Sequence, residues 1–144
     1  MICRSRYSRF GLLVLLPLAL LAGCGRGPER APVEGKVLFE GEPLRFGTVM
    51  FQPPGGQPSQ ARIRPDGTFT METFGHGPGA VVGRCRVRIT SYESDAPGAD
   101  GATSDEPALG RMLIPERYGN YATSGLEVEV RPGRNEPVVF ELTR

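Results

Sequence analysis

The chain has 144 residues, a formal net charge of +1, 20 glycines, 14 prolines and one histidine. This length favours a single domain, and a Gly and Pro content about twice the average share indicates a turn-rich chain. The near-zero net charge argues against a nucleic-acid binder, which normally carries a basic excess. A single histidine leaves little room for acid–base catalysis or for a metal site.

Residues 1–23 have the composition of a secretory signal peptide. Arg4, Arg6 and Arg9 precede an apolar run from Phe10 to Ala22. That run is shorter than the roughly 20 residues that a membrane-spanning helix needs. A short apolar stretch behind a basic start is typical of a cleaved signal, and we expect its removal to lower the net charge by three units, to −2.

The apolar run ends in Leu21-Ala22-Gly23-Cys24, which resembles the lipobox of bacterial lipoproteins. The resemblance implies cleavage between Gly23 and Cys24, followed by attachment of diacylglycerol and an N-acyl chain to Cys24. The alternative is an ordinary signal with an incidental cysteine. Gly25 rather than Asp follows, which by analogy with a bacterial sorting rule favours the outer membrane over the inner one. We expect an exported, membrane-anchored protein on the periplasmic or cell-surface side.

The three cysteines agree with this interpretation. Cleavage removes Cys3 and lipidation uses Cys24, so Cys85 has no partner for an internal disulfide. We expect Cys85 to be a small buried apolar residue rather than a reactive thiol.

After a polar tether at residues 24–32, the hydrophobic pattern changes to an alternation of period two, which indicates β-strands. Turn signals separate the alternating segments, and Asp66-Gly67 is the strongest of them, so we expect a hairpin there. No helical period is found. Seven short strands in residues 33–144 predict an all-β, antiparallel β-sandwich. We also expect the domain to be monomeric, although the strand pattern does not determine this. The expected strands are Val33–Glu40, Gly47–Gln52, Ala61–Arg64, Thr68–Thr73, Arg84–Thr90, Leu126–Arg131 and Val138–Leu142.

The exception is a long loop at residues 91–125. Its first half, residues 93–106, carries five acidic residues and no basic one, and we expect a surface loop. Its second half contains Met112, Ile114 and Tyr118 and is apolar enough to pack back on the sandwich.

Several short segments share one further pattern of Gly, Pro and apolar residues. They are Val33-Glu34-Gly35-Lys36-Val37, Gly41-Glu42-Pro43-Leu44, Gly47-Thr48-Val49-Met50-Phe51, Pro65-Asp66-Gly67-Thr68-Phe69, Ile114-Pro115-Glu116-Arg117-Tyr118 and Thr123-Ser124-Gly125-Leu126.

Together with the lipobox, these segments resemble bacterial lipoproteins that carry a carboxypeptidase-regulatory-like, transthyretin-like domain. The resemblance covers nearly the whole mature chain and implies a seven-stranded Greek-key sandwich of prealbumin topology. It implies no established activity, and a fold alone does not supply one.

The chain has few residues suited to catalysis or metal binding. Two groups of enzymes are built on folds related to the transthyretin-like one. The iron site of intradiol dioxygenases needs two His, and hydroxyisourate hydrolases need several His and a Tyr-Arg-Gly-Ser tail, whereas this chain has only His76. A Ser–His–acid triad would have to use His76 and Ser124, yet no nucleophile motif surrounds Ser124. His76 and Cys85 alone are too few ligands for zinc. We therefore expect no enzyme, no metal and no cofactor beyond the lipid.

The candidate partner surface consists of Arg84, Arg86 and Arg88, which alternate outward, with Tyr118 and Tyr121 from the long loop. The arginines can meet an anionic envelope polymer or lipid headgroups, or they can pair with Glu127 and Glu129 across the strands. The tyrosines can line a carbohydrate surface or pin the loop. The expected function is a binding or structural module of the cell envelope that holds a protein or polysaccharide. The alternative is an accessory or carrier subunit of a secreted enzyme system.

Overall fold

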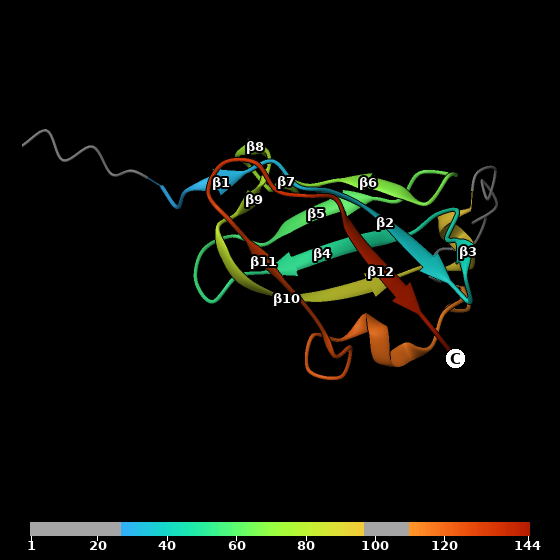
Figure 1. Ribbon diagram of the computed structural model, residues 1–144. Helices are drawn as coiled ribbons and strands as arrows, with labels where there is room; N and C mark the ends of the chain where they lie inside the picture. The colour runs from blue at the N-terminus through green and yellow to red at the C-terminus, as the bar shows by residue number, and fades with distance from the viewer. Residues whose placement is uncertain (1–26, 97–109) are drawn as a thin grey trace, which may run out of the picture.

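The computed structural model describes residues 27–96 and 110–144. Within them the chain is all-β, with two facing sheets and a small additional pair of strands (Figure 1). The expected signal peptide 1–23, the Gly23–Cys24 cleavage site and residues 97–109 of the long loop lie outside the described residues.

The larger sheet has six strands, all paired antiparallel, in the order β11–β10–β4–β5–β7–β8. These are β11 (Leu126–Val130), β10 (Gly83–Thr90), β4 (Thr48–Gln52), β5 (Ser59–Arg62), β7 (Glu72–Thr73) and β8 (Gly77–Pro78).

The smaller sheet is built around β2, and two further strands pair near the N-terminal end. Its strands are β12 (Val138–Leu142), β2 (Glu34–Phe39), β3 (Glu42–Pro43) and β6 (Thr68–Thr70), and the separate pair is β1 (Arg30–Ala31) with β9 (Ala80–Val81). Two short 3₁₀ helices, η1 (Glu93–Asp95) and η2 (Glu116–Gly119), lie in the long loop.

The period-two alternation explains which side chains enter the core. In β10, Cys85, Val87 and Ile89 are fully buried, while Arg84 and Arg86 between them are exposed. Each of the seven expected strands overlaps a strand of the structure, with β5 beginning two residues earlier than expected, so the all-β prediction is confirmed. Successive strand residues point to opposite faces, and burial of one face therefore selects this sequence pattern.

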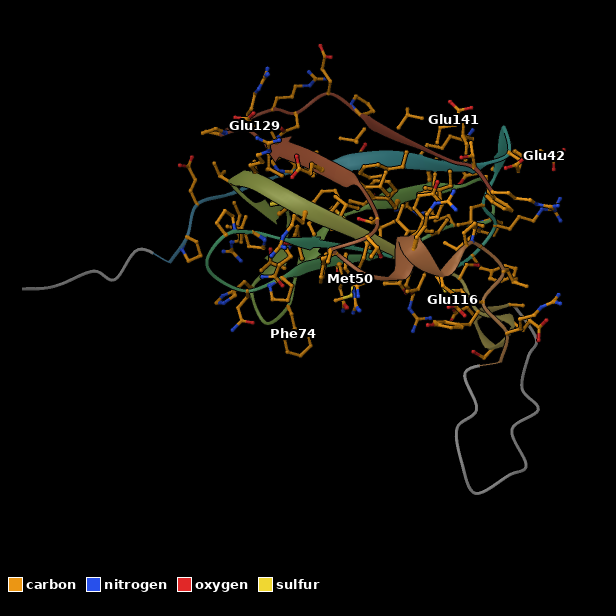
Figure 2. The ribbon with its side chains drawn as sticks, turned by 90° about the horizontal axis from the view of Figure 1, so that it is seen from below. Glu42, Met50, Phe74, Glu116, Glu129 and Glu141 are labelled. Carbon is orange, nitrogen blue, oxygen red and sulfur yellow. The ribbon has the colours of Figure 1, made fainter. Side chains whose placement is uncertain are left out.

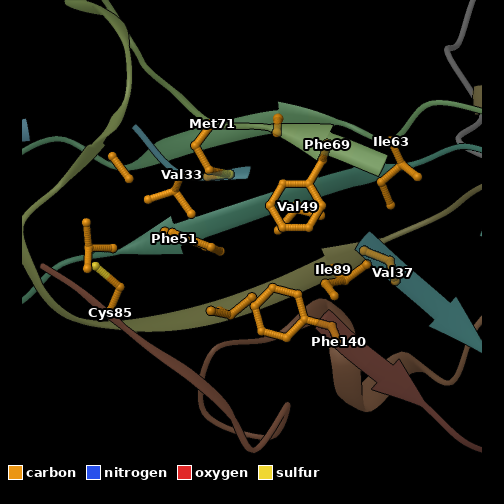
Figure 3. Close-up of a cluster of buried hydrophobic side chains, with 14 of the residues drawn as sticks. Val33, Val37, Val49, Phe51, Ile63, Phe69, Met71, Cys85, Ile89 and Phe140 are labelled. Carbon is orange, nitrogen blue, oxygen red and sulfur yellow. The ribbon is translucent and has the colours of Figure 1, made fainter. Parts of the chain in front are cut away.

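An aromatic cluster joins the two sheets (Figure 3). Phe51 of β4 meets Phe69 and Phe140 of the smaller sheet edge to face, with ring centroids 6.4 and 6.1 Å apart. Phe69 and Phe140 stack on each other at 6.1 Å. Such pairs add about 0.5–1.5 kcal/mol to the stabilisation from burial alone, so this cluster is the centre of the core.

One strand pair departs from the expected antiparallel arrangement. β12 runs parallel to β2, with Val138 opposite Gly35 and Leu142 opposite Phe39. Alternation within a strand determines which residues are buried but not the direction of the neighbouring strand, so the pattern did not reveal this pair.

The hairpin expected at Asp66-Gly67 is correct only at its turn. The amide of Gly67 donates to the carbonyl of Arg64 at 2.8 Å, and hydrogen bonds from Thr68 to Asp66 lower the pKa of that carboxyl. The expected strand Thr68–Thr73 then divides at Met71. β6 pairs with β2 in the smaller sheet, and β7 pairs with β5 in the larger one. Both Phe69 and Met71 are fully buried, so the chain crosses between sheets without leaving the core.

The domain also begins before the expected boundary at Val33. Arg30 and Ala31, assigned above to the tether, pair with Val81 and Ala80, and Ala31 is buried. A two-residue strand has no measurable period, which is why the sequence pattern missed it.

The described parts of the long loop are attached to the sandwich. The Ser91 hydroxyl donates to the carbonyl of Phe46 at 2.9 Å, and Tyr92 forms a β-bridge with Met112. Ile114 and Tyr118 are buried. The expectation that the second half of the loop packs back is therefore confirmed.

Candidate binding face

Three arginines of β10 and one tyrosine form a single outer surface, which we call the arginine face; Arg84 and Arg86 are exposed there, and Arg88 and Tyr121 are half-buried. It comprises Arg84, Arg86 and Arg88 on the outer side of the six-stranded sheet and Tyr121 from the loop after η2. The two-residue period of β10 points all three arginines away from the core, as the sequence predicts. Their surroundings differ, however.

Arg84 is held by an acidic residue of β11. Its Nε donates to a carboxylate oxygen of Glu127 at 3.0 Å. Glu127 lies directly opposite Arg86 in the strand register, so the pair with Arg84 is diagonal. The hydrogen bond to Glu127, and then its negative charge, raise the pKa of the Arg84 guanidinium. Because both side chains are largely exposed, the pair contributes little stability.

Arg88 is held by uncharged side chains. Its Nη2 lies 2.9 Å from the sulfur of Met50 on β4, and its guanidinium carbon lies 5.2 Å from the centre of the Tyr121 ring. The contact with Tyr121 is a cation–π interaction, worth about 0.5–1 kcal/mol at an exposed site. Arg88 thereby helps to hold Tyr121 on the face.

Arg86 differs from its two neighbours. It is exposed and lies opposite Gln52 of β4, and no side chain or carbonyl within residues 27–96 and 110–144 bonds its guanidinium. A shallow cavity of about 470 Å³ opens beside it, and one wall is formed by two prolines. The lining residues are Gln52, Pro53, Pro54, Arg84, Arg86 and Tyr121. The Arg86 guanidinium thus lines this cavity, and its N–H donors have no acceptor among the described residues.

Tyr118 does not belong to this surface. Its side chain is buried, and its hydroxyl accepts a hydrogen bond from the Thr143 amide at 3.1 Å. The guanidinium of Arg117 lies 4.6 Å from its ring centre. Tyr118 therefore pins η2 to the end of β12, which is the second of the two roles considered for it, and it is no partner-surface residue.

The residues considered for catalysis have structural positions. Ser124 is buried, and its hydroxyl donates to the Val87 carbonyl. His76 is exposed in the turn between β7 and β8. Within the part of the chain that the structure describes, no three His, Cys, Asp or Glu side chains gather as metal ligands would. The same residues contain no helix with the length and apolarity of a membrane span.

Cys85 is a free thiol with a fully buried side chain. Burial raises its pKa from the ordinary 9.0 to about 11, because the thiolate would lose its hydration. The prediction of a buried apolar cysteine is confirmed.

Two surface residues were missed from the sequence. The sequence pattern places Met50 only within a strand, because nothing in the pattern of β4 shows that its sulfur lies against Arg88. Phe74 is 71% exposed in the turn between β7 and β8. The sequence did hold a signal for this exposure. Phe74 stands beside the glycine-rich segment Gly75–Gly79, where no alternating pattern assigns an aromatic residue to the core.

Comparison of the chain with protein-family models, with curated proteins and with solved structures finds no match.

Proposed function

We propose that this protein is an exported lipoprotein that is held on a membrane by lipids on Cys24 and acts as a non-enzymatic binding module of the cell envelope. The observation that carries the proposal is Leu21-Ala22-Gly23-Cys24 at the end of a short apolar run. Diacylglycerol and an N-acyl chain together supply enough buried CH₂ groups for stable anchoring, whereas one chain alone does not. The folded part is a sandwich-like domain, for which we propose the transthyretin-like topology.

The arginine face is the proposed contact surface for the partner. Arg86 has no acceptor among the described residues, while Arg88 holds Tyr121 beside it. A guanidinium binds carboxylate or phosphate oxygens well, and an aromatic ring stacks on the apolar face of a sugar or contacts a side chain. This combination fits an anionic polysaccharide or an acidic protein surface of the envelope. Binding sites built from side chains of a rigid sheet need little reorganisation.

The anchor is tested by metabolic labelling with a fatty-acid analogue in bacteria that express the full chain. Cys24→Ser should abolish the label and release the protein from membranes. Cys3→Ser is the matched control, because this residue precedes the cleavage site and its loss should leave labelling unchanged. Persistent labelling of the Cys24→Ser protein contradicts the lipobox assignment.

The partner is tested by crosslinking in intact cells, followed by purification of the native and Cys24→Ser proteins. Recovery of envelope polysaccharide, or of a surface protein in variable amounts, with the anchored form alone supports the binding module. Recovery of a secreted enzyme in fixed stoichiometry with both forms supports the accessory subunit instead.

A further inference from the structure

Phe74 is exposed in a position where it has no packing role. It is 71% exposed at the tip of the turn that joins β7 and β8. Single exposed hydrophobic residues are common and need no explanation by themselves. What distinguishes Phe74 is its place relative to the start of the domain. Val139 of β12, at 59%, is the other large exposed hydrophobic residue in the described part of the chain.

The turn that carries Phe74 is fastened to the first strand. The amide of His76 donates to the carbonyl of Thr73 at 2.9 Å, and Thr73 pairs with Gly77. The guanidinium of Arg30 in β1 donates to the carbonyl of His76. Figure 1 shows β1, β7, β8 and β9 together at one end of the sandwich, and Figure 2 shows the Phe74 side chain projecting from the ribbon. Phe74 and β1 therefore lie at one corner of the domain.

The chain leaves little distance between this corner and Cys24. The carbonyl of Glu29 accepts a hydrogen bond from Val82 at 2.9 Å, so the backbone is fixed to the domain from Glu29 onward. Five residue steps separate Cys24 from Glu29, and a fully extended chain spans at most about 18 Å over that length. A lipid on Cys24 thus keeps Glu29 within about 18 Å of the anchored cysteine, so the corner stays close to the membrane surface.

We propose that Phe74 is a membrane-contact residue, whose ring enters the headgroup–acyl boundary beside the anchor and sets the orientation of the domain. This inference rests on the proposed lipid anchor. The occupant is the bilayer interface because the anchor brings that interface within reach and because Phe carries no polar atom that would resist entry. Arg30, exposed on the same corner, faces the headgroup level with its cationic side chain.

The test uses the absence of tryptophan from the chain. Phe74→Trp and Val139→Trp each introduce one fluorophore at an exposed site, so neither change should disturb the core. The lipidated full-length proteins are reconstituted into vesicles with and without brominated acyl chains. For Phe74→Trp we expect emission at shorter wavelength and strong quenching by the brominated lipid. For Val139→Trp, the matched control, we expect emission as in water and no quenching.

The outcomes separate this inference from the anchor on which it rests. Vesicle binding without quenching at position 74 overturns the membrane contact and leaves the anchor intact. Equal quenching at positions 74 and 139 overturns it as well, because the domain then has no fixed orientation. A spectral shift at position 74 only after envelope proteins are added assigns Phe74 to a protein partner instead. Failure of the lipidated protein to associate with vesicles overturns the proposed anchor, and it overturns the proposed membrane contact as well.

Discussion

At the scale of single residues, three arginines that are equivalent in the sequence have three different environments. Arg84 meets Glu127, Arg88 lies between Met50 and Tyr121, and Arg86 has no partner among the described residues. Alternation predicts that all three point outward, because each is an odd number of steps from a buried neighbour. The partner of each depends on the diagonal and opposite positions of β4 and β11, which only the register supplies.

The buried thiol of Cys85 leads to a pH-dependent prediction. Its pKa is raised from 9.0 to about 11, so the folded state favours the neutral thiol. The stability that this burial contributes is fully present below about pH 9 and is lost as the pH rises through about 11. Urea unfolding at pH 9 and pH 11 measures this change in the free energy of unfolding. The parent chain should lose more stability between the two pH values than Cys85→Ala does, because the two proteins share every titrating group except this thiol.

The same burial predicts slow alkylation. In a chain carrying Cys3→Ser and Cys24→Ser, the only remaining thiol should resist iodoacetamide when folded and react readily in urea. Rapid modification under native conditions would show that β10 opens locally, contrary to its central place in the sheet.

Gly35 of β2 has no room for a side chain. A Cβ placed there would lie 2.3 Å from the carbonyl oxygen of Val138 and 2.4 Å from the ring of Phe69. We expect Gly35→Ala to lower the free energy of unfolding by about 1–3 kcal/mol, as overpacking of a core does. Gly55→Ala is the control, because nothing lies within 4 Å of its Cβ position and it should change stability by less than about 0.5 kcal/mol. Equal denaturation midpoints for the two variants would contradict the close approach of Val138 and Phe69 to Gly35.

At the scale of the elements, the sequence predicts individual strands better than it predicts their partners. The long alternating segments, such as β10 and β11, were found because burial of one face imposes a period of two. The division of Thr68–Thr73 at Met71 was not found, since Phe69 and Met71 keep the same inward alternation on both sides of the crossing. Strands as short as β1, β3 and β8 contain too few residues to show any period.

The element that closes the long loop, η2, also gives a prediction. The hydroxyl of Tyr118 accepts from the Thr143 amide at 3.1 Å and lies 3.2 Å from Nη2 of Arg117. Tyr118→Phe removes these hydrogen bonds and should destabilise the domain by about 0.5–1.5 kcal/mol in denaturant titration. Tyr121→Phe is the matched control, because it keeps the ring near Arg88 and its hydroxyl makes no hydrogen bond within residues 27–96 and 110–144. A larger effect at position 121 would reverse the roles assigned to the two tyrosines.

At the scale of the whole molecule, the proposed membrane contact and the proposed partner surface occupy different places. Phe74 lies on the corner that includes β1, whereas the arginine face lies along β10. Of these two surfaces the sequence indicated only the second. An exposed residue in a turn leaves no periodic signal, and its closeness to β1 arises from a pairing between β1 and β9, fifty positions apart.

This separation predicts that binding and anchoring can be altered independently. Arg86→Glu replaces by an anion the cation of the arginine face that has no partner within residues 27–96 and 110–144. We expect it to reduce crosslinking to an anionic partner at least tenfold while the protein stays on the membrane. Arg134→Glu makes the same charge change in the turn between β11 and β12 and should leave crosslinking unchanged. An equal loss in both variants would show that overall charge, and not this face, governs the interaction.

The parallel pairing of β12 with β2 has a consequence for the order of events during biogenesis. Gly35 and Val138 are neighbours in the sheet but 103 positions apart in the chain. The edge of β2 and the pocket filled by Phe140 and Leu142 remain open until the last of these residues is available. Contacts of such sequence separation form slowly. In the proposed export from the N-terminus, the sandwich cannot close on the far side of the membrane until Phe140 and Leu142 have crossed, and Cys24, the proposed lipid site, emerges long before that point.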